Sequence, residues 1–284
     1  MAETLNFSGH ETFHCRPFWL KKGHDFLQQQ RSFSDDSAVA YLGVGKNMVT
    51  AIRFWMKAFG MADDNQLTDL AKKLLADKGW DPYLEDLGSL WLLHYHLVKE
   101  RHASIASIVF TELRDRVPEF TVKQYADYVI SEIPRSNAKT LEKDFGVFVR
   151  NYRDKDEELD DLAGLLADLE LVSMTKVDAE DEADRKARRV YYIERKRRAT
   201  LPARILLYAI LDSHPEGLSL SLTTMMDPVG QMFALDKEGM TELLTEVDKN
   251  YKGITFARNS GVYELQFKQR PDRWTILSDH YAQR

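Results

Sequence analysis

Apolar residues recur every three or four positions along most of this chain, which is the spacing of helices that bury one face. The clearest run ends at Gly60, a usual helix stop, and its apolar positions are Val44, Met48, Ile52, Trp55 and Phe59. Further helices are predicted over residues 67–77, 81–100 and 103–116. The stretch 81–117 is apolar enough to form the core of the N-terminal half.

The middle of the chain predicts a helix-turn-helix arrangement. A helix that opens with Thr121 ends before Pro134, and a short turn leads to a second helix over residues 139–153. Three further elements are predicted after it: a helix over 160–173 that runs into a strand, a charged loop over 178–189 and a strand over 190–195. The loop and the strand would form a wing beside the helices.

The C-terminal segment repeats this order of elements and ends with a hairpin. Its predicted elements are a helix over 201–213, a short strand over 218–221, a helix over 239–251, a hairpin over 254–267 and a closing helix over 271–281. The sequence therefore predicts a mainly α protein of tandem helix-turn-helix or winged-helix-like units with short β-hairpin wings. The predicted domains are an N-terminal arm and helical domain (1–117), a helix-turn-helix or winged-helix-like domain (118–198) and a C-terminal winged-helix-like domain (199–284).

Composition agrees with a globular protein, since 44% of the residues are hydrophobic and 30% are charged. The single cysteine, Cys15, excludes an internal disulfide and a zinc site made of four cysteines. The first residues show no basic stretch followed by an apolar run, and no stretch approaches about 18 apolar residues. We therefore expect a cytoplasmic protein.

The distribution of charge changes the meaning of the net charge of −6. Residues 154–184 hold thirteen acids and two bases, so the rest of the chain carries +5. Residues 185–198 then hold eight bases and one acid, and these bases either bind a polyanion or neutralise the acidic run beside them. Because binding to a polyanion depends on where bases cluster, the acidic total does not exclude a nucleic-acid partner.

The N-terminal arm carries the densest group of chemically active side chains. His10, Glu11 and His14 match the pattern H-E-x-x-H, in which a helix sets two imidazoles on one metal and the glutamate acts on a bound water. A glycine precedes the motif and a proline follows it closely, so a helical metalloprotease site is not expected. Two interpretations stay open: partly buried polar anchors of the arm, or acid/base or metal-binding groups for another hydrolytic reaction.

A glycine-rich turn over residues 43–47 precedes the helix that ends at Gly60. Ala40 stands where a phosphate-binding loop has its first glycine, and Asn47 replaces the hydroxyl that binds Mg²⁺, so ATP hydrolysis is not expected. Lys46 and Asn47 at a helix N-terminus still suit a phosphate of the DNA backbone. An ordinary turn with a solvated lysine is the alternative.

The helix over 139–153 carries bases at spacings of four, seven and three residues, which places them on one face. These bases are Lys139, Lys143, Arg150 and Arg153. Acidic residues alternate with them, so a solvated surface and a DNA-contacting surface are both open.

The combination of motifs resembles a known family. The motifs are F-S-G-H-E-T-F (7–13), Arg16, W-L-K-K-G (19–23), G-V-G-K-N-M-V and A-I-R-F-W within 43–55, and K-T-L-E-K-D-F and F-V-R-N-Y within 139–152. Together they are similar to a bacterial domain family that sits beside sulfurtransferase and PAPS-reductase-like genes. Its best-known type is the SspB component of Ssp DNA phosphorothioation and phage-defence systems. The likeness spans nearly the whole chain and is weakest over 154–198 and in the last third.

The resemblance implies a DNA-nicking component that opens the backbone for sulfur insertion. It also implies three partners: a cysteine desulfurase, an ATPase and an ATP-dependent sulfur-transfer enzyme. The family supplies no catalytic residues that can be carried over. A non-catalytic DNA-recognition subunit and a winged-helix transcription regulator are the alternatives.

Chemistry narrows the candidate residues, because cleavage of a phosphodiester needs a general base or a metal-bound nucleophile and a cation near the developing charge. The candidate catalytic residues are Glu11, His14 and Arg16, and the candidate ligands of a divalent metal (Mg²⁺ or Mn²⁺) are His10 and His14. The candidate DNA-binding residues are Lys21, Lys46, Asn47, Arg53, Lys139, Lys143, Arg150 and Arg153.

Overall fold

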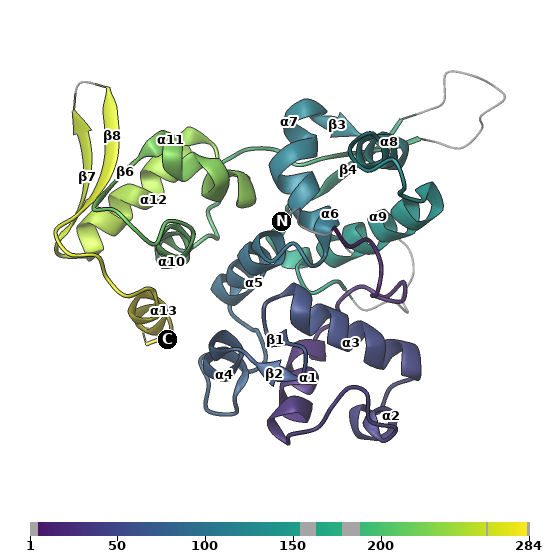
Figure 1. Ribbon diagram of the computed structural model, residues 1–284. Coiled ribbons are helices and arrows are strands. Elements are labelled where there is room, and N and C mark those ends of the chain that lie inside the picture. The colour runs from purple at the N-terminus through teal and green to yellow at the C-terminus, as the bar shows by residue number, and fades with distance from the viewer. Residues whose placement is uncertain (1–4, 154–162, 178–187, 260, 283–284) are drawn as a thin grey trace. The chain divides into compact units, whose positions relative to one another are not determined.

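The computed structural model describes residues 5–153, 163–177, 188–259 and 261–282. These residues form a mainly α protein with small antiparallel sheets (Figure 1). They divide into two compact units, Met1–Tyr83 with His96–Ile193, and Leu84–Tyr95 with Glu194–Arg284. The predicted boundary at 117/118 lies inside the first unit, and the predicted boundary at 198/199 lies close to the change of unit after Ile193.

The first unit contains most of the helices. They are α1 (Trp19–Gln28), α2 (Ala38–Leu42), α3 (Lys46–Ala58), α4 (Asp69–Leu75), α6 (Ser104–Ile108), a π-helical turn (Val109–Leu113), α7 (Arg114–Arg116), α8 (Val122–Glu132), α9 (Ala138–Tyr152) and a 3-10 turn (Ala167–Leu169). Its strands are β1 (Ala62–Asp63), β2 (Gln66–Leu67), β3 (Glu119–Phe120), β4 (Ser173–Val177) and β5 (Arg188–Tyr192).

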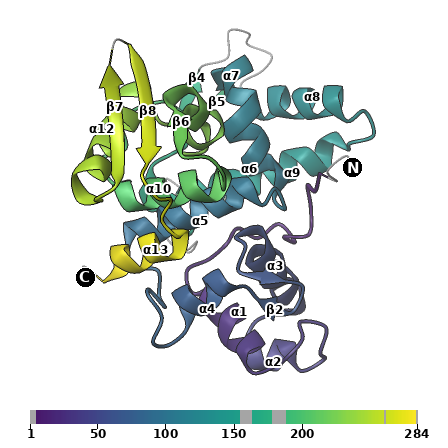
Figure 2. The ribbon, with the colours of Figure 1, turned by 60° about the vertical axis from the view of Figure 1, so that its left-hand side comes forward.

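The second unit is built on the first part of α5 (Leu87–Lys99), up to Tyr95. Its other helices are α10 (Ala203–Ser213), α11 (Leu222–Met225), a π-helical turn (Met226–Gly230), α12 (Lys237–Asn250) and α13 (Arg273–Tyr281). Its strands are β6 (Ser219–Ser221), β7 (Ile254–Asn259) and β8 (Val262–Phe267), which lie side by side with α12 nearby in Figure 2.

Most of the predicted helices are confirmed, and their ends follow local chemistry. The Thr121 hydroxyl accepts the Gln124 amide, and the Gln124 side chain accepts the Thr121 amide, so α8 begins with a complete capping box. The helix α9 begins after Asn137, whose side chain accepts the Thr140 amide. The predicted hairpin over 254–267 is present as β7 and β8, paired in antiparallel register from Ile254↔Phe267 to Asn259↔Val262.

The helix predicted over 160–173 is wrong for the residues that are described, whereas the strand predicted to follow it is present as β4, which begins at Ser173. Between residues 163 and 172 only the 3-10 turn forms. The Leu165 amide donates to the Cys15 carbonyl and the Leu166 amide donates to the Asn151 carbonyl, so this segment bonds to other parts of the unit instead of to itself. The predicted strand is present as β5, and most of the predicted loop, residues 178–187, lies outside the described residues.

Both units contain the same succession of elements. In the first unit the helical stretch 104–116 is followed by β3, α8, α9 and the hairpin β4–β5, with sheet order β3-β5-β4. In the second unit α10 is followed by β6, α11, α12 and the hairpin β7–β8, with sheet order β6-β8-β7. In each case the short first strand pairs with the last strand of the hairpin.

Aromatic side chains fill the two cores separately. In the first unit Phe145 of α9 contacts Phe120, Tyr125, Phe148 and Tyr191, with ring centroids 5.0 to 6.1 Å apart. In the second unit the ring of Phe233 contacts Trp91, His94 and Tyr95. Each helix succession therefore encloses its own core. No helix formed by the described residues is both long and apolar enough to cross a membrane.

Candidate nucleic-acid interface

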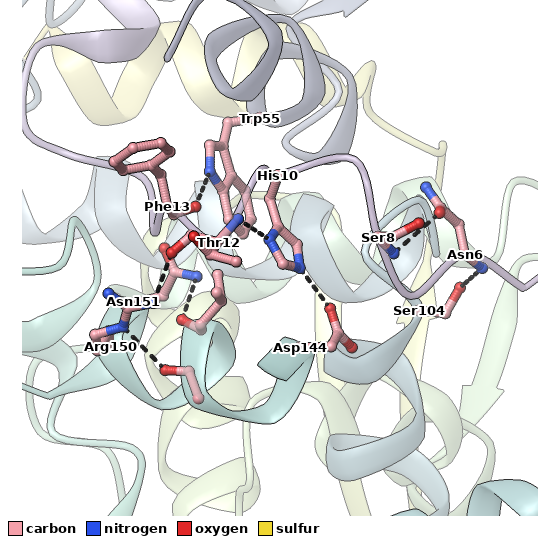
Figure 3. Close-up of polar contacts among 12 residues, drawn as sticks. Asn6, Ser8, His10, Thr12, Phe13, Trp55, Ser104, Asp144, Arg150 and Asn151 are labelled. Atoms are coloured by element: carbon pink, nitrogen blue, oxygen red, sulfur yellow. Dashed lines mark hydrogen bonds and ion pairs between the residues drawn. The ribbon is translucent and has the colours of Figure 1, made fainter. Parts of the chain in front are cut away.

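The N-terminal arm, residues 5–18, is fixed to three helices of the first unit (Figure 3). Its Asn6 exchanges two hydrogen bonds with Ser104 at the start of α6, because the Asn6 amide donates to Ser104 Oγ (2.7 Å) and the Ser104 amide donates to the Asn6 carbonyl (3.2 Å). Trp55 Nε1 of α3 donates to the Phe13 carbonyl at 3.0 Å. The arm is therefore an ordered part of the first unit, attached by hydrogen bonds to its helices.

His10 is a buried anchor of the arm. Its Nε2 lies 2.8 Å from Asp144 Oδ1 of α9, and the two residues are 4% and 3% exposed. The Thr12 amide points at His10 Nδ1 (3.2 Å), so Nδ1 accepts and Nε2 carries the proton that is donated to Asp144. Tyr125 donates to the other carboxylate oxygen at 3.3 Å. Burial raises the pKa of Asp144, and the bonds from His10 and Tyr125 act in the opposite direction.

The following residues continue the attachment to α9. The Cys15 amide donates to Asn151 Oδ1 at 2.9 Å, and burial raises the pKa of the Cys15 thiol well above its usual value. His14 is buried at 3% exposure beside it. The Arg16 guanidinium lies over the rings of Phe13 and Trp19, 5.8 and 5.7 Å from their centroids. His14, Cys15 and Arg16 therefore pack against the arm and the helices that hold it.

Glu11 differs from its neighbours in the arm. Glu11 and Thr12 both adopt left-handed backbone conformations, with φ of 49° and 63°, and both are exposed. Such a conformation costs about 1–3 kcal/mol per non-glycine residue, so the surroundings must hold it. Arg150 of α9 does so by donating from Nη2 to the Thr12 carbonyl at 2.7 Å. The Glu11 carboxylate has no hydrogen bond or ion pair to a described residue.

His10, one of the two predicted metal ligands, is not available to a metal ion. Both ring nitrogens of His10 are already bonded, to Asp144 and to the Thr12 amide, so neither offers a free lone pair. Among the residues that the structure describes, no three or more His, Cys, Asp and Glu side chains gather in a way that could hold a metal.

Helix α9 presents one open face to solvent. Lys139, Lys143 and Gly146 follow each other at helical spacing on this face and are exposed, together with Glu142. A Cβ at Gly146 would meet nothing within 4 Å. The other two predicted bases are engaged: Arg150 bonds to the Thr12 and Gly146 carbonyls, and Arg153 bonds to the Val172 carbonyl at 3.1 Å.

The bases of the hairpin β4–β5 face each other. The register pairs Lys176 with Arg189 and Val177 with Arg188, and all four are exposed. Directly opposed residues of an antiparallel pair project on the same side, so Lys176 and Arg189 form a like-charged pair, which costs stability in water. Sequence analysis assigned no role to Lys176, because the two bases lie thirteen positions apart in the chain and only the register joins them.

The remaining predicted DNA contacts are scattered. Lys21 is buried and bonds to the carboxylates of Asp25 (2.5 Å) and Asp77 (2.7 Å), so its charge is already used. Arg53 is exposed on α3, 3.8 Å from Asp64. Lys46 and Asn47 are exposed in the first turn of α3.

The tip of the arm rests on the other half of α3. A Cβ at Gly9 would lie 3.0 Å from the Phe54 ring, which shows how closely the arm approaches that residue. Phe54 is eight residues, about 12 Å of helix, from Lys46. The arm turn and the 43–47 turn are therefore held at different ends of α3.

Asp144 and Asn151, which hold the arm, were missed by the sequence analysis. Asp144 was interpreted as one of the acids that alternate with the bases of α9. Its spacing gives a better indication, because Asp144 and Asn151 fall between Leu141, Phe145, Phe148 and Tyr152 on the buried face of the helix. A polar residue inside an apolar stripe needs a buried partner.

The comparisons with known proteins fit this architecture. Residues 7–281 match the family described as "Protein of unknown function (DUF4007)", so the chain belongs to this family. No curated protein matches the chain. Among solved structures, it is similar to an SspB crystal structure, with a TM-score of 0.82 and 26% identity over 98% of this chain and 88% of the other. A magnesium-ion-bound SspB crystal structure matches over the same shares, with a TM-score of 0.82 and 25% identity. The chain is thus an SspB-type protein.

Proposed function

We propose that this protein is a DNA-binding component of a DNA phosphorothioation system, and that it contacts duplex DNA with α9 and the hairpin β4–β5 of its first unit. The observation that carries the proposal is the like-charged pair Lys176–Arg189 on the hairpin β4–β5. This hairpin follows α9 in the chain, and α9 exposes Lys139 and Lys143. A like-charged pair costs stability unless an anion comes between or beside the two charges, and a DNA phosphate is that kind of anion.

The order of elements supports this assignment. A helix, a short strand, two further helices and a hairpin form a winged-helix-like unit, and in helix-turn-helix proteins the last helix enters the major groove. In the first unit that helix is α9, and its hairpin carries Lys176, Arg188 and Arg189. The helix would read the groove while the hairpin holds the backbone.

The second unit has the opposite charge on the corresponding helix. The exposed acids of α12 are Glu238, Glu242 and Glu246, and Arg197 forms an ion pair with Glu242 at 2.6 Å. Arg198 is buried and donates to the Glu194 and Ala234 carbonyls. Two bases of the run 195–198 therefore already have partners inside this unit. For this reason we assign DNA contact to the first unit alone.

DNA nicking is a second candidate function, favoured by the conformation of Glu11. The Glu11 carboxylate is exposed on a strained turn, and the next residue of this turn, Thr12, accepts a hydrogen bond from Arg150 of α9 through its carbonyl. Strain of this kind is a feature of functional sites. His14 and Arg16, predicted as its catalytic partners, are packed into the arm, so we propose Glu11 alone as the group that faces the backbone.

We also propose three partners from the same system: a cysteine desulfurase, an ATPase and a sulfur-transfer enzyme. We propose magnesium as the ion of the nicking reaction because one SspB structure is magnesium-bound. Since the described residues do not form a metal site, the ion would have to be held largely by DNA phosphates or by another subunit.

Fluorescence anisotropy with a labelled duplex tests the DNA interface. Lys143→Ala and Arg189→Ala should each weaken binding, and the dependence of the logarithm of the binding constant on that of the salt concentration should lose about one unit of slope per contact. Lys249→Ala on α12 is the matched control, because it removes the same charge from an exposed position. Equal effects of all three variants would show a general charge effect and overturn the assignment.

Relaxation of supercoiled plasmid with Mg²⁺ or Mn²⁺ tests nicking. Glu11→Gln should abolish nicking and leave the melting temperature and duplex binding unchanged, since the Glu11 side chain supports nothing in the fold. Undiminished nicking by this variant would exclude the Glu11 assignment. It would leave DNA binding by α9 and β4–β5 untouched.

A further inference from the structure

A cavity of about 700 Å³ opens in the first unit, away from the proposed DNA-contacting helix. It lies between the C-terminal end of α1, the turn that joins β1 to β2, and α4. Its volume falls within the range of about 300–1,000 Å³ that is usual for sites that bind small organic molecules. None of its lining residues belongs to the arm or to α9.

The described lining has three kinds of chemistry. Leu27, Leu67 and Ala76 supply an apolar surface. Amide side chains surround it, and the cations Arg31 and Lys72 complete the wall, while no described lining residue is a carboxylate. Lys72 lies 3.8 Å from the carboxylate of Asp69, whereas Arg31 forms no ion pair with a described residue. An apolar surface, hydrogen-bonding groups that carry no charge and the cation of Arg31 are complementary to a flat heterocycle attached to a phosphate.

The polar groups of the cavity are available for a ligand. The amide side chains of Gln28, Gln30 and Gln66 make no hydrogen bond to a described residue. His24 is 1% exposed, and its Nδ1 lies 3.0 Å from Asp25 Oδ1. Its Nε2 has no partner among the described residues. This ring nitrogen can therefore bond to water or to a ligand in the cavity.

Arg31 is held in place before any ligand arrives. Its guanidinium lies over the Tyr41 ring, 3.2 Å from the centroid, and its Nε donates to Gln29 Oε1 at 3.2 Å. A stacked guanidinium loses little freedom when it binds an anion, and its remaining N–H groups suit two oxygens of a phosphate.

We propose that this cavity binds one nucleotide. The base lies on Leu27 and Leu67, its hydrogen-bonding edge meets the amides and His24, and its phosphate meets Arg31. Glutamine amides pair well with the edges of bases. The nucleotide has two sources with the same chemistry, a base turned out of a DNA strand or a free mononucleotide. The first source rests on the proposed function and agrees with enzymes that take a base out of the stack.

Calorimetric titration of the full chain with dAMP, dGMP, dCMP and dTMP tests the site, with deoxyribose 5-phosphate as the ligand that lacks a base. At least one nucleotide should bind more tightly than the sugar phosphate. The pair Gln28→Leu and Gln66→Leu keeps the side-chain volume and should weaken that binding by about tenfold, the effect of roughly one lost hydrogen bond. Gln269→Leu, at an exposed position of the second unit, is the matched control and should bind as the parent does.

A duplex that contains 2-aminopurine separates the two sources, because the fluorescence of this base rises when it leaves the stack. A rise that the double glutamine variant loses shows a base from a strand. Nucleotide binding without any rise shows a free mononucleotide and overturns the strand source. Nucleotides that bind no better than the sugar phosphate, or that bind the double glutamine variant as tightly as the Gln269→Leu control, overturn the site. Neither result depends on Lys143→Ala and Arg189→Ala, which test the proposed function by themselves.

Discussion

The His10 imidazole donates to the buried carboxylate of Asp144, across a separation of 134 positions in the sequence. This bond joins the N-terminal arm to the helix that we propose for DNA contact. The Thr12 amide donates to the other ring nitrogen, Nδ1. The imidazole therefore donates to Asp144 from Nε2 while it accepts from the arm at Nδ1.

The character of this pair can be tested with two substitutions. Asp144→Asn keeps an oxygen that accepts from His10, so the free energy of unfolding should change by no more than about 1 kcal/mol. Asp144→Ala leaves buried His10 and Tyr125 groups without their partner and should cost about 3 kcal/mol. Urea denaturation of the parent and both variants gives the two differences. Equal losses in both variants would show that the ionised carboxylate itself stabilises the fold.

The pKa of Asp144 sets a dependence on pH. Burial raises this pKa above the usual 3.8, so the contribution of the carboxyl to stability is fully present below its unfolded pKa and is lost as pH rises through the folded pKa. The parent protein should therefore lose stability relative to Asp144→Asn as the pH rises above the usual aspartate pKa of 3.8. Denaturation of the two proteins across this range measures the difference. A parent that gains stability relative to Asp144→Asn would mean that the pKa is lowered in the folded state.

The buried thiol of Cys15 should be unreactive in the folded protein. Reaction requires the thiolate, and burial both raises the pKa of this thiol and blocks access to it. Iodoacetamide should label Cys15 only when the protein unfolds, so the labelling rate should rise with urea along the unfolding transition. Rapid labelling of the native protein at neutral pH would show that the arm opens.

Substitution of Gly146 should change the stability of the fold and the affinity for DNA in opposite directions. It lies inside α9 at an exposed position where a Cβ meets nothing, so Gly146→Ala should stabilise the fold by about 1 kcal/mol. If a DNA backbone approaches this face closely, the added methyl group should weaken duplex binding. Thermal unfolding and anisotropy measure the two effects, and Gly43→Ala offers no matched control because Gly43 has a positive φ of 63°. Stabilisation without any loss of binding would place the DNA elsewhere.

The sequence predicts the helices and the hairpins well, because both are local patterns. The period of α3, the capping box of α8 and the hairpin over 254–267 all depend on residues close together in the chain. The predicted helix over 160–173 fails because its amides bond to Cys15 and Asn151, which are distant in sequence. Helix propensity carries no information about such competing partners.

In the candidate site, too, local patterns could be predicted from the sequence, whereas contacts between residues distant in the chain could not. The sequence singled out His10, but the ring could be an anchor or a metal ligand until Asp144 was placed beside it. Lys21 and Arg150 have the positive charge expected of phosphate contacts. Two carboxylates bind Lys21, however, and Arg150 donates to the Thr12 carbonyl. The pair Lys176–Arg189 needs a register that spacing along the chain does not give. Charge can be counted in a sequence, but whether it is already neutralised depends on the fold.

Helix α5 gives the second unit a discontinuous chain. Trp91 and Tyr95, which contact Phe233 in its core, are made about a hundred residues before the rest of that core. A ribosome therefore completes nearly all of the first unit while these aromatic side chains still await their neighbours. A fragment cut at residue 194 would lack them and expose Phe233 to water. A gene segment that encodes residues 194–284 alone therefore does not encode the complete second unit.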